Sequence, residues 1–227
     1  MRILYIIPAR GGSKRIPGKN IKLLVGKPLI QYTIECAREL AQDKDICVST
    51  DDDDIIKVVE GFGLKIPFKR PDYLSTDTAT TSDVILHALD YYEGLNRNYD
   101  LAVVLQPTSP LRKANHVIEA INLYSEDTDM IVSVKKFRSA AFICHETENF
   151  LLEFSLIDES RRGASHEDFF EYNGAIYVIS VEKLKKFGLH GLKRKKKYLM
   201  NEMESVDIDN EIDFLYASIL INTNDSK

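Results

Sequence analysis

The sequence predicts an α/β fold in which a mostly parallel central sheet carries helices on both faces. Short apolar runs such as residues 3–7 and 101–105 indicate strands that are buried on both sides, as is usual in parallel sheets. Helical periodicity follows most of these runs, so strands and helices alternate along the chain. Glycine, proline and polar residues gather where the runs end, and open α/β sheets bind ligands at that carboxyl edge.

Length and composition limit what the chain can do. With 227 residues it can bury one sizeable core, and we expect a single domain over residues 1–227 with one inserted segment, residues 135–172. The net charge of -5 argues against nucleic-acid and membrane partners. Three widely spaced cysteines lack a metal-binding pattern, and we find no leader-like or membrane-length apolar stretch. We therefore expect a cytoplasmic protein.

The first half of the chain alternates regularly. We expect strands over residues 3–7, 46–49, 64–68 and 101–105, and helices over residues 28–40, 55–59 and 82–92. The acidic run of residues 51–54 invites comparison with a metal site, but aspartate and threonine favour helix N-termini, so we predict a capped helix. The polar loop of residues 69–81 is longer than a connection needs, which is typical of a functional loop, although it can also cap the next helix.

The second half continues the pattern and then interrupts it. We expect helices over residues 114–124 and 181–187, and strands over residues 130–134 and 173–178. Between them, residues 135–172 contain short apolar pieces separated by polar turns, which indicates a hairpin-like excursion that needs a partner surface. The basic run of residues 193–197 is interpreted as solvated surface rather than as a guide for anionic substrates. A last helix is expected to bury Ile212, Leu215, Tyr216, Ile219 and Leu220.

The loop after the first strand carries the clearest chemical signal. Its glycine- and proline-rich stretch holds Arg10, Lys14, Arg15 and Lys19, so cations and backbone N–H groups converge at one strand end. An ordinary surface loop would explain the same residues, and neither G-x-x-x-x-G-K-S/T nor G-x-G-x-x-G is present. However, cations this close repel one another unless an anion offsets their charge. We therefore predict a polyphosphate site.

A rigid polar turn follows the strand that we expect over residues 101–105. After residues 101–105, Pro107 and Pro110 stiffen a turn that holds Gln106, Thr108 and Ser109 in place. This turn therefore presents fixed polar groups at the same edge of the sheet as the cationic loop.

Near the carboxyl end, Asp207 and Asp209 point to one side of an extended chain while Ile208 points to the other. Two such carboxylates suit Mg²⁺ or Mn²⁺, because a hard divalent cation completes its shell with phosphate and water. The alternative is that they cap the helix that follows, but Asn210 can supply that cap. We predict a metal site at the two aspartates.

Several motifs together resemble the CMP-N-acylneuraminate cytidylyltransferases, which activate sialic and legionaminic acids as CMP conjugates. They are A-R-x-x-S-K-x-x-x-x-K-N at 9–20, R-P-x-x-L-S-x-D-T-A at 70–79, L-Q-P-T-S-P-L-R at 105–112, N-G-A-I-Y at 173–177 and D-I-D-x-x-x-D-F at 207–214. The resemblance implies a Rossmann-like nucleotidyltransferase fold. It also implies a nucleotide site made of Ala9, Arg10, Gly11, Ser13, Lys14, Lys19, Asn20, Arg70, Thr81 and Gln106.

The same resemblance assigns the remaining roles. It implies catalytic roles for Arg10, Lys19, Asp207 and Asp209, and a substrate site made of Gln106, Thr108, Ser109, Arg162 and Asn173. In the family the segment corresponding to residues 135–172 reaches a second subunit, which implies a homodimer. Sialic acid enzymes usually carry Arg-Gln-x-Leu-Pro here and an arginine shortly before N-G-A-I-Y, whereas this chain has Arg162-Gly163-Ala164-Ser165 and Glu171. Arg162 can take the role of the arginine that binds the sugar carboxylate only if one extra residue is allowed before Asn173.

We therefore expect a nucleotidyltransferase that moves CMP from CTP to the anomeric hydroxyl of a 2-keto-3-deoxy sugar acid and releases pyrophosphate. The acceptor would be a nonulosonic acid of the N-acetylneuraminate or legionaminate type, used in cell-surface glycan biosynthesis. Alternatives are a pseudaminate or eight-carbon acceptor, or a nucleotide-binding module without turnover. The N-G-A-I-Y and D-I-D-x-x-x-D-F segments argue against the eight-carbon acid, and the missing G-x-G-T-R-type opening argues against a sugar-1-phosphate nucleotidylyltransferase.

Overall fold

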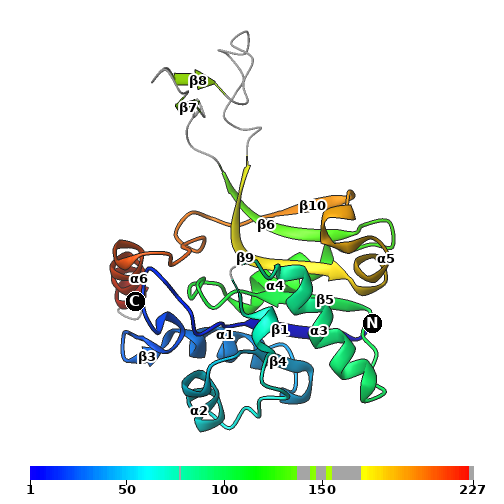
Figure 1. Cartoon of the computed structure of the whole chain (residues 1–227). Coiled ribbons are helices and arrows are strands. Elements are labelled where there is room, and N and C mark those ends of the chain that lie inside the picture. The colour runs from blue at the N-terminus through cyan, green and yellow to red at the C-terminus, as the bar shows by residue number, and fades with distance from the viewer. Residues whose placement is uncertain (77, 137–143, 147–151, 155–169, 225–227) are drawn as a thin grey trace.

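The computed structural model describes residues 1–76, 78–136, 144–146, 152–154 and 170–224. Within these ranges the centre of the molecule is a six-stranded sheet in the order β10-β6-β9-β5-β1-β4 (Figure 1). The strands are β1 Ile3–Pro8, β4 Ile46–Ser49, β5 Leu101–Leu105, β6 Met130–Lys136, β9 Phe170–Ser180 and β10 Lys195–Leu199. β9 runs antiparallel to both of its neighbours, and the other neighbouring pairs are parallel.

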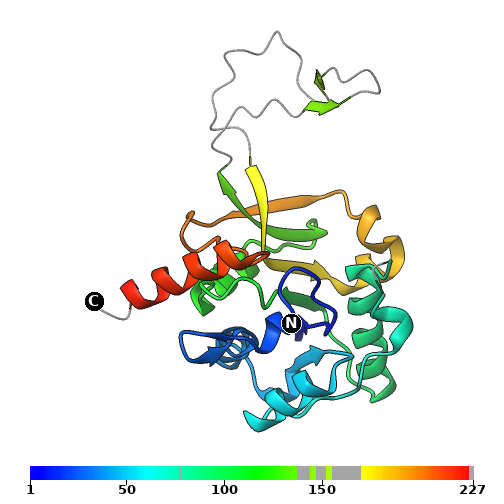
Figure 2. The ribbon, with the colours of Figure 1, turned by 60° about the vertical axis from the view of Figure 1, so that its left-hand side comes forward.

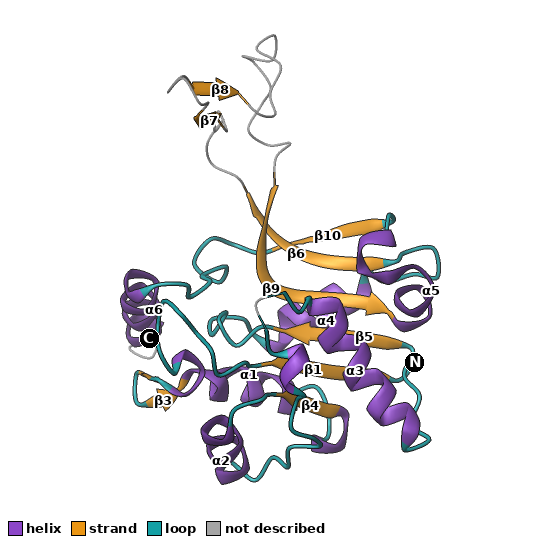
Figure 3. Cartoon of the chain, viewed as in Figure 1, coloured by secondary structure: helices purple, strands orange, loops and turns teal. Residues whose placement is uncertain are grey.

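Helices cover both faces of this sheet, as Figure 3 shows in purple against the orange strands. They are α1 Leu29–Arg38, α2 Asp53–Gly61, α3 Thr81–Gly94, α4 Ala114–Asn122, α5 Val181–Gly191 and α6 Glu211–Asn224. The side chains of β1 alternate between the faces: Tyr5 and Ile7 pack with α1, α2 and α4, whereas Leu4 and Ile6 pack with α3 and α5. This alternation explains the continuous apolar run in the sequence. The predicted α/β class with a mostly parallel sheet is confirmed.

Smaller elements complete the described chain. They are the paired strands β2 Leu23–Leu24 and β3 Lys27–Pro28, and the short 3₁₀ helices Lys19–Ile21, Asp43–Asp45 and Asp72–Leu74. Of the inserted segment predicted at residues 135–172, much lies outside the described residues. The described pieces include β7 Cys144–Glu146 and β8 Leu152–Phe154, which pair antiparallel. The role of this segment therefore stays a prediction.

The acidic run before α2 is a helix cap, as predicted. The Asp52 side chain accepts hydrogen bonds from the N–H groups of Asp54 and Ile55, at 2.8 and 3.0 Å. The polar loop before α3 caps its helix in the same way, because Thr80 and Asp83 form a reciprocal capping box. In both cases a side-chain oxygen satisfies N–H groups that have no partner within the helix.

The strand predicted over residues 64–68 is wrong. The chain here makes an isolated parallel bridge between Thr50 and Lys69, and residues 64–68 belong to no strand. Leu64 and Ile66 are nevertheless buried against the core of α1 and α2. Their apolar character therefore reflects packing beneath a loop, and Pro67 lacks the N–H group that a strand ladder needs.

The inward face predicted for the last helix is wrong for four of its five residues; only Leu220 of the five packs, partly buried, against the protein. Ile212 and Leu215 of α6 are 79% and 62% exposed, and Tyr216 and Ile219 are exposed too. Phe214, Ala217 and Ile221 are buried instead, in a small core with Ile16, Leu24 and Leu29. Because α6 carries apolar residues around most of its circumference, the 3.6-residue period does not identify which side faces the protein.

The basic run lies at an edge of the sheet. Lys195, Lys196 and Lys197 begin β10, which pairs with β6 on one side, and their side chains are exposed. The predicted solvated surface is therefore confirmed. Exposed lysines along an edge strand disfavour pairing with the strand of another molecule.

Within the described ranges, no helix combines the length and the apolar character that crossing a bilayer requires.

Candidate active site

Two adjoining hollows open at the carboxyl ends of β1 and β5. The first, the phosphate chamber, has a volume of about 390 Å³ and is lined by Pro8, Arg10, Ser13, Lys14, Arg15, Ile16, Lys19, Asn20, Gln106, Pro107, Thr108 and Asp209. The second, the base chamber, has a volume of about 350 Å³ and is lined by Pro8, Arg10, Arg70, Leu74, Thr76, Ala79, Thr80, Thr81, Val84 and Gln106. Pro8, Arg10 and Gln106 line both chambers, so the two form one divided cleft.

The cationic loop after β1 is held through its backbone. The N–H of Gly11 donates to Asp51 Oδ1 at 3.1 Å, and the Asn20 side-chain amide donates to the Arg10 carbonyl at 3.0 Å. Glycine is required at position 11, because an added Cβ would lie 2.2 Å from Asp52 Oδ2 and 2.7 Å from Asp52 Cβ. Asn20 therefore lies under the loop and supports it, and it lines the phosphate chamber, as its predicted place in the nucleotide site requires.

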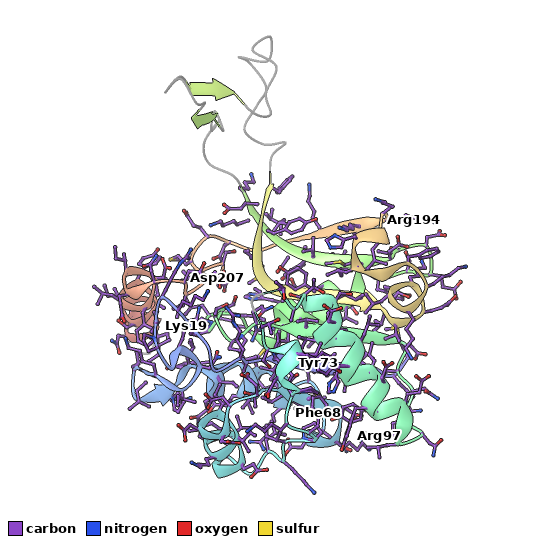
Figure 4. The ribbon with its side chains drawn as sticks, in the orientation of Figure 1. Lys19, Phe68, Tyr73, Arg97, Arg194 and Asp207 are labelled. Atoms are coloured by element: carbon purple, nitrogen blue, oxygen red, sulfur yellow. The ribbon has the colours of Figure 1, made fainter. Side chains whose placement is uncertain are left out.

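Lysine 19 joins the cationic loop to the acidic segment. Its side chain is only 13% exposed, and Nζ donates to the Ile208 carbonyl at 2.7 Å and lies 3.6 Å from Asp209 Oδ1. Arg15, which is far more exposed, lies 3.3 Å from Asp209 Oδ2. Figure 4 shows Lys19 beside Asp207, and Figure 2 shows the dark blue amino-terminal loop beside the start of the red helix α6. The loop after β1 and the segment before α6 thus meet at the cleft, although they are far apart in the sequence.

The acidic segment is fixed by the turn after β5. The Ile208 N–H donates to the Thr108 carbonyl at 2.8 Å, and the Thr108 side chain bonds to the Asp207 carboxylate. Asp207 keeps access to solvent but has crowded surroundings, and this partial desolvation raises its pKa above the usual range. The nearby charge of Asp209 raises the pKa further, whereas Thr108 and Lys19 oppose the shift. Two carboxylates whose charges repel each other favour a cation beside them.

The helix after this segment is capped without the two aspartates. Asn210 Oδ1 accepts the N–H groups of Ile212 and Asp213, at 2.8 and 3.1 Å, so the cap predicted at Asn210 is confirmed. Within the residues that the structure describes, no cluster of three or more histidine, cysteine or acidic side chains is arranged to hold a metal. Asp207 and Asp209 offer hard oxygen atoms and fit a divalent cation that takes its other ligands from phosphate and water.

Two predicted nucleotide residues, Arg70 and Thr81, line the base chamber. Arg70 is 4% exposed, its Nε donates to Ser49 Oγ at 3.0 Å, and a second N–H donates to the Ser49 carbonyl. Burial lowers the pKa of the guanidinium, and the charge of Asp51 partly compensates. The chamber wall therefore contains an arginine whose position is set by the end of β4.

Five described residues of the predicted site do not line either chamber. Ala9 and Ser109 are buried in the core, and Gly11 packs against the start of α2. Asn173 is the fourth. For Arg162 the structure gives no position, because this residue lies outside the described ranges. Asp207 is the fifth: it is exposed, and the Thr108 side chain bonds to its carboxylate. The remaining described side chains of the predicted site line the cleft.

Asn173 lies in a buried hydrogen-bond network. Its Oδ1 accepts from Ser133 Oγ at 2.6 Å, and its Nδ2 donates to Ser205 Oγ at 2.9 Å. It therefore links β6 and β9 to the segment that leads into Asp207. Gly174 follows with a φ of 73°, and an added Cβ there would lie 3.6 Å from Asp207 Oδ2. The N-G pair allows β9 to bend close to the acidic segment.

Comparison with known proteins decides the family. Residues 4–207 match the profile of a family described as Cytidylyltransferase. This chain belongs to the cytidylyltransferase family. The resemblance drawn from the motifs is therefore confirmed, and the protein is a nucleotidyltransferase.

Curated relatives of this cytidylyltransferase differ in length and in the acid that they are named for. A CMP-N,N'-diacetyllegionaminic acid synthase of Legionella pneumophila is 32% identical over 227 residues, which are 99% of this chain and 98% of the relative. An N-acylneuraminate cytidylyltransferase of Escherichia coli is 34% identical over 95% of this chain, which spans 51% of that relative. A pseudaminic acid cytidylyltransferase of Campylobacter jejuni is 45% identical over 49% of this chain and 48% of the relative.

The cytidylyltransferase fold is also found among solved structures. One is a CMP:2-keto-3-deoxy-manno-octonic acid synthetase complexed with CTP, with a TM-score of 0.71 and 19% identity over 99% of this chain and 100% of that one. At this identity the likeness supports the fold, and the predicted Rossmann-like nucleotidyltransferase architecture is confirmed.

Proposed function

We propose that this cytidylyltransferase moves CMP from CTP to the anomeric hydroxyl of a nonulosonic acid of the legionaminate or N-acetylneuraminate type, and releases pyrophosphate. One observation carries the proposal: a divided cleft places a base chamber next to a cationic chamber that is lined by Asp209, whose charge acts on the neighbouring Asp207. A nucleoside triphosphate requires this sequence of environments. Relatives named for CMP activation of such acids, one of them similar over nearly its whole length, support the choice of acceptor.

In this proposal the chain's cations stabilise charge on the phosphates. The cytosine occupies the base chamber beside Arg70 and Thr81, and the triphosphate lies along Arg10, Lys14 and Lys19. Preorganised donors at the position where negative charge develops lower the barrier, because they need no rearrangement during the reaction. Lys19 is best placed for this role, since it is little exposed and is held between the loop and the acidic segment.

Asp207 and Asp209 would hold Mg²⁺ or Mn²⁺. When bound, such an ion supplies Lewis-acid neutralisation of phosphate oxygen charge. The chain's own part is to keep the two carboxylates together, which Thr108 and the Ile208 backbone do from one side and Lys19 from the other. Gln106 and Thr108 line the phosphate chamber, and Thr108 also bonds to the acidic segment, so we assign both to the acceptor acid.

We further propose a cytoplasmic homodimer, in which residues 135–172 complete the acceptor site. This proposal rests on the family resemblance of the segment. A pseudaminate acceptor is the second candidate, favoured by the 45% identity over half of the chain with an enzyme of that name.

Pyrophosphate release from CTP and Mg²⁺ tests the function. The panel contains legionaminate, N-acetylneuraminate, pseudaminate and the eight-carbon ulosonic acid, and Asp207→Asn serves as the matched inactive control. We expect release with legionaminate or N-acetylneuraminate. Release with pseudaminate alone would transfer the assignment to the second candidate, whereas tight CTP binding without release for any acid would indicate a module that only binds. Sedimentation of the same protein tests the dimer.

A further inference from the structure

An arginine that lines neither chamber lies directly behind their shared wall. Arg112 ends the L-Q-P-T-S-P-L-R motif and is 4% exposed. One terminal nitrogen donates to the carbonyls of Gln106 and Ala175, each at 3.0 Å, and the other donates to Thr33 Oγ1 at 2.8 Å. The guanidinium therefore ties together three parts of the molecule, namely the turn after β5, the strand β9 and the helix α1.

The buried charge of Arg112 has an unusual setting. Among the residues that the structure describes, no carboxylate forms an ion pair with it, and its Nε has no hydrogen-bond partner. Taking a cation out of water without an opposite charge costs several kcal/mol. A neutral apolar side chain would fill the same space at lower cost, so the hydrogen bonds themselves are what the arginine provides.

These hydrogen bonds determine how the turn faces the cleft. The Gln106 carbonyl is held inside by Arg112, by Thr33 Oγ1 at 3.4 Å and by the Ser109 N–H at 3.3 Å. Gln106 itself lines both chambers. Two residues further on, Thr108 holds the acidic segment through its carbonyl and its side chain. A shift of the turn would therefore move the shared wall and the support of Asp207 together.

We propose that Arg112 is a positioning residue for nucleotidyl transfer, which fixes the turn of residues 106–109 and thereby the places of Gln106 and Thr108 in the cleft. This inference rests on the proposed function. Lysine is a poor replacement, because a tetrahedral ammonium on a shorter side chain does not reproduce the planar fork that reaches two carbonyls and a hydroxyl. A displacement of about 1 Å at a reacting centre can reduce the rate about 100-fold.

A double-mutant cycle between Arg112→Met and Gln106→Ala tests the inference. We expect Arg112→Met to lower kcat about 100-fold in the wild-type background. With Gln106 already removed, the further loss should be about tenfold or less, because residues that act through one another are not additive. Arg112→Lys should not restore kcat. Arg38→Met is the matched control, since Arg38 is a partly buried arginine that pairs with Asp43 and the Phe62 carbonyl away from the cleft.

Thr33→Val provides the second route if Arg112→Met does not fold. It removes the hydroxyl that accepts from Arg112 and donates to the Gln106 carbonyl, while the side chain keeps its shape. We expect a loss of kcat of about tenfold that again shrinks when Gln106 is alanine. Losses that multiply fully in both cycles, or variants within twofold of the wild type, would overturn the positioning role. If wild-type protein releases no pyrophosphate, the proposed function fails, and CTP affinity replaces kcat as the readout of the same cycles.

Discussion

The two walls of the cleft are held in different ways. The cationic loop that follows β1 is anchored by contacts to its backbone, from Asp51 to the Gly11 N–H and from Asn20 to the Arg10 carbonyl. The acidic segment is held by residues from more parts of the chain: the Thr108 carbonyl accepts the Ile208 N–H, Lys19 donates to the Ile208 carbonyl, and Asn173 donates to Ser205. The comparison teaches that the charges which meet the ligand depend on the hydrogen bonds that hold their backbone in place.

The strongest test of this comparison removes a charge and leaves its support intact. Asp207→Asn keeps a side chain of the same shape, and Thr108 can still bond to it. We expect kcat to fall about 100- to 1,000-fold, as when a group that stabilises transition-state charge is lost. The melting temperature should stay the same or rise slightly, because the repulsion from Asp209 disappears.

Measuring kcat and thermal unfolding of the same preparation separates the two effects. Asp127→Asn is the control, since Asp127 is a highly exposed acid paired with Arg194 outside the chambers. A melting temperature that falls sharply in Asp207→Asn would show that the carboxylate itself supports the fold. This result would contradict the separation between the charge and the hydrogen bonds that hold it.

The second test removes support and leaves the charges intact. Asn173→Ala removes the hydrogen bonds to Ser133 and Ser205, which keep their bonds to Ile176 and Asn201, and it takes away the acceptor of the buried Ala175 N–H. An unsatisfied buried group costs about 1–3 kcal/mol. We expect the free energy of unfolding in urea to decrease by that amount, and kcat to fall as the segment before Asp207 loosens. Unchanged stability with a raised KM for the acid would mean that Asn173 contacts the acceptor, as the motif resemblance implies.

The third test concerns the close approach at Gly11. In Gly11→Ala the new Cβ would clash with Asp52, and overpacking of this kind typically costs about 1–3 kcal/mol. Because the loop can relieve the clash only by moving, we expect the Kd for CTP to rise about tenfold. Gly12→Ala is the matched control: its Cβ would meet no described atom within 4 Å. Equal CTP affinity in both variants, measured by calorimetry, would contradict a fixed loop.

The smallest effect is expected at the exposed ion pair between Arg15 and Asp209. Arg15 and Asp209 form an ion pair with side chains 71% and 57% exposed, and such pairs contribute at most about 1 kcal/mol. Arg15→Gln should leave the free energy of unfolding nearly unchanged and weaken CTP binding less than Lys19→Gln does. The difference should shrink with added salt, because exposed charges are screened. An Arg15→Gln effect larger than that of Lys19→Gln would reverse this ranking.

The sequence predicted the cationic wall better than the acidic one for a physical reason. The loop follows β1 directly, so its residues share one strand end and their neighbourhood is local. The position of Asp207 depends instead on Thr108 and Asn173, which are far away in the chain, and the motif alone did not reveal that Asn173 is buried. The direction of β9 could not be predicted from the sequence either. This strand lies antiparallel between β5 and β6, and its apolar residues would suit a parallel strand equally well.

Two errors show where local patterns fail. The apolar residues Leu64 and Ile66 pack beneath a loop, and residues 64–68 pair with no strand. On α6 the burial falls on Phe214 and Ala217 rather than on Ile212 and Leu215. Burial depends on which surface lies opposite, and the sequence of one element does not specify that surface.

The place of β1 between β4 and β5 also determines when during synthesis the cleft can exist. Ile6 pairs with Cys47, but on the other side Leu4 pairs with Ala102. At about 5–20 residues per second, a ribosome takes several seconds to pass from one partner to the other. Throughout that interval β1 presents an apolar, unpaired edge, the kind of edge that invites misassociation. The nascent protein therefore depends on early pairing with β4, and CTP can assist folding only after β5 has emerged.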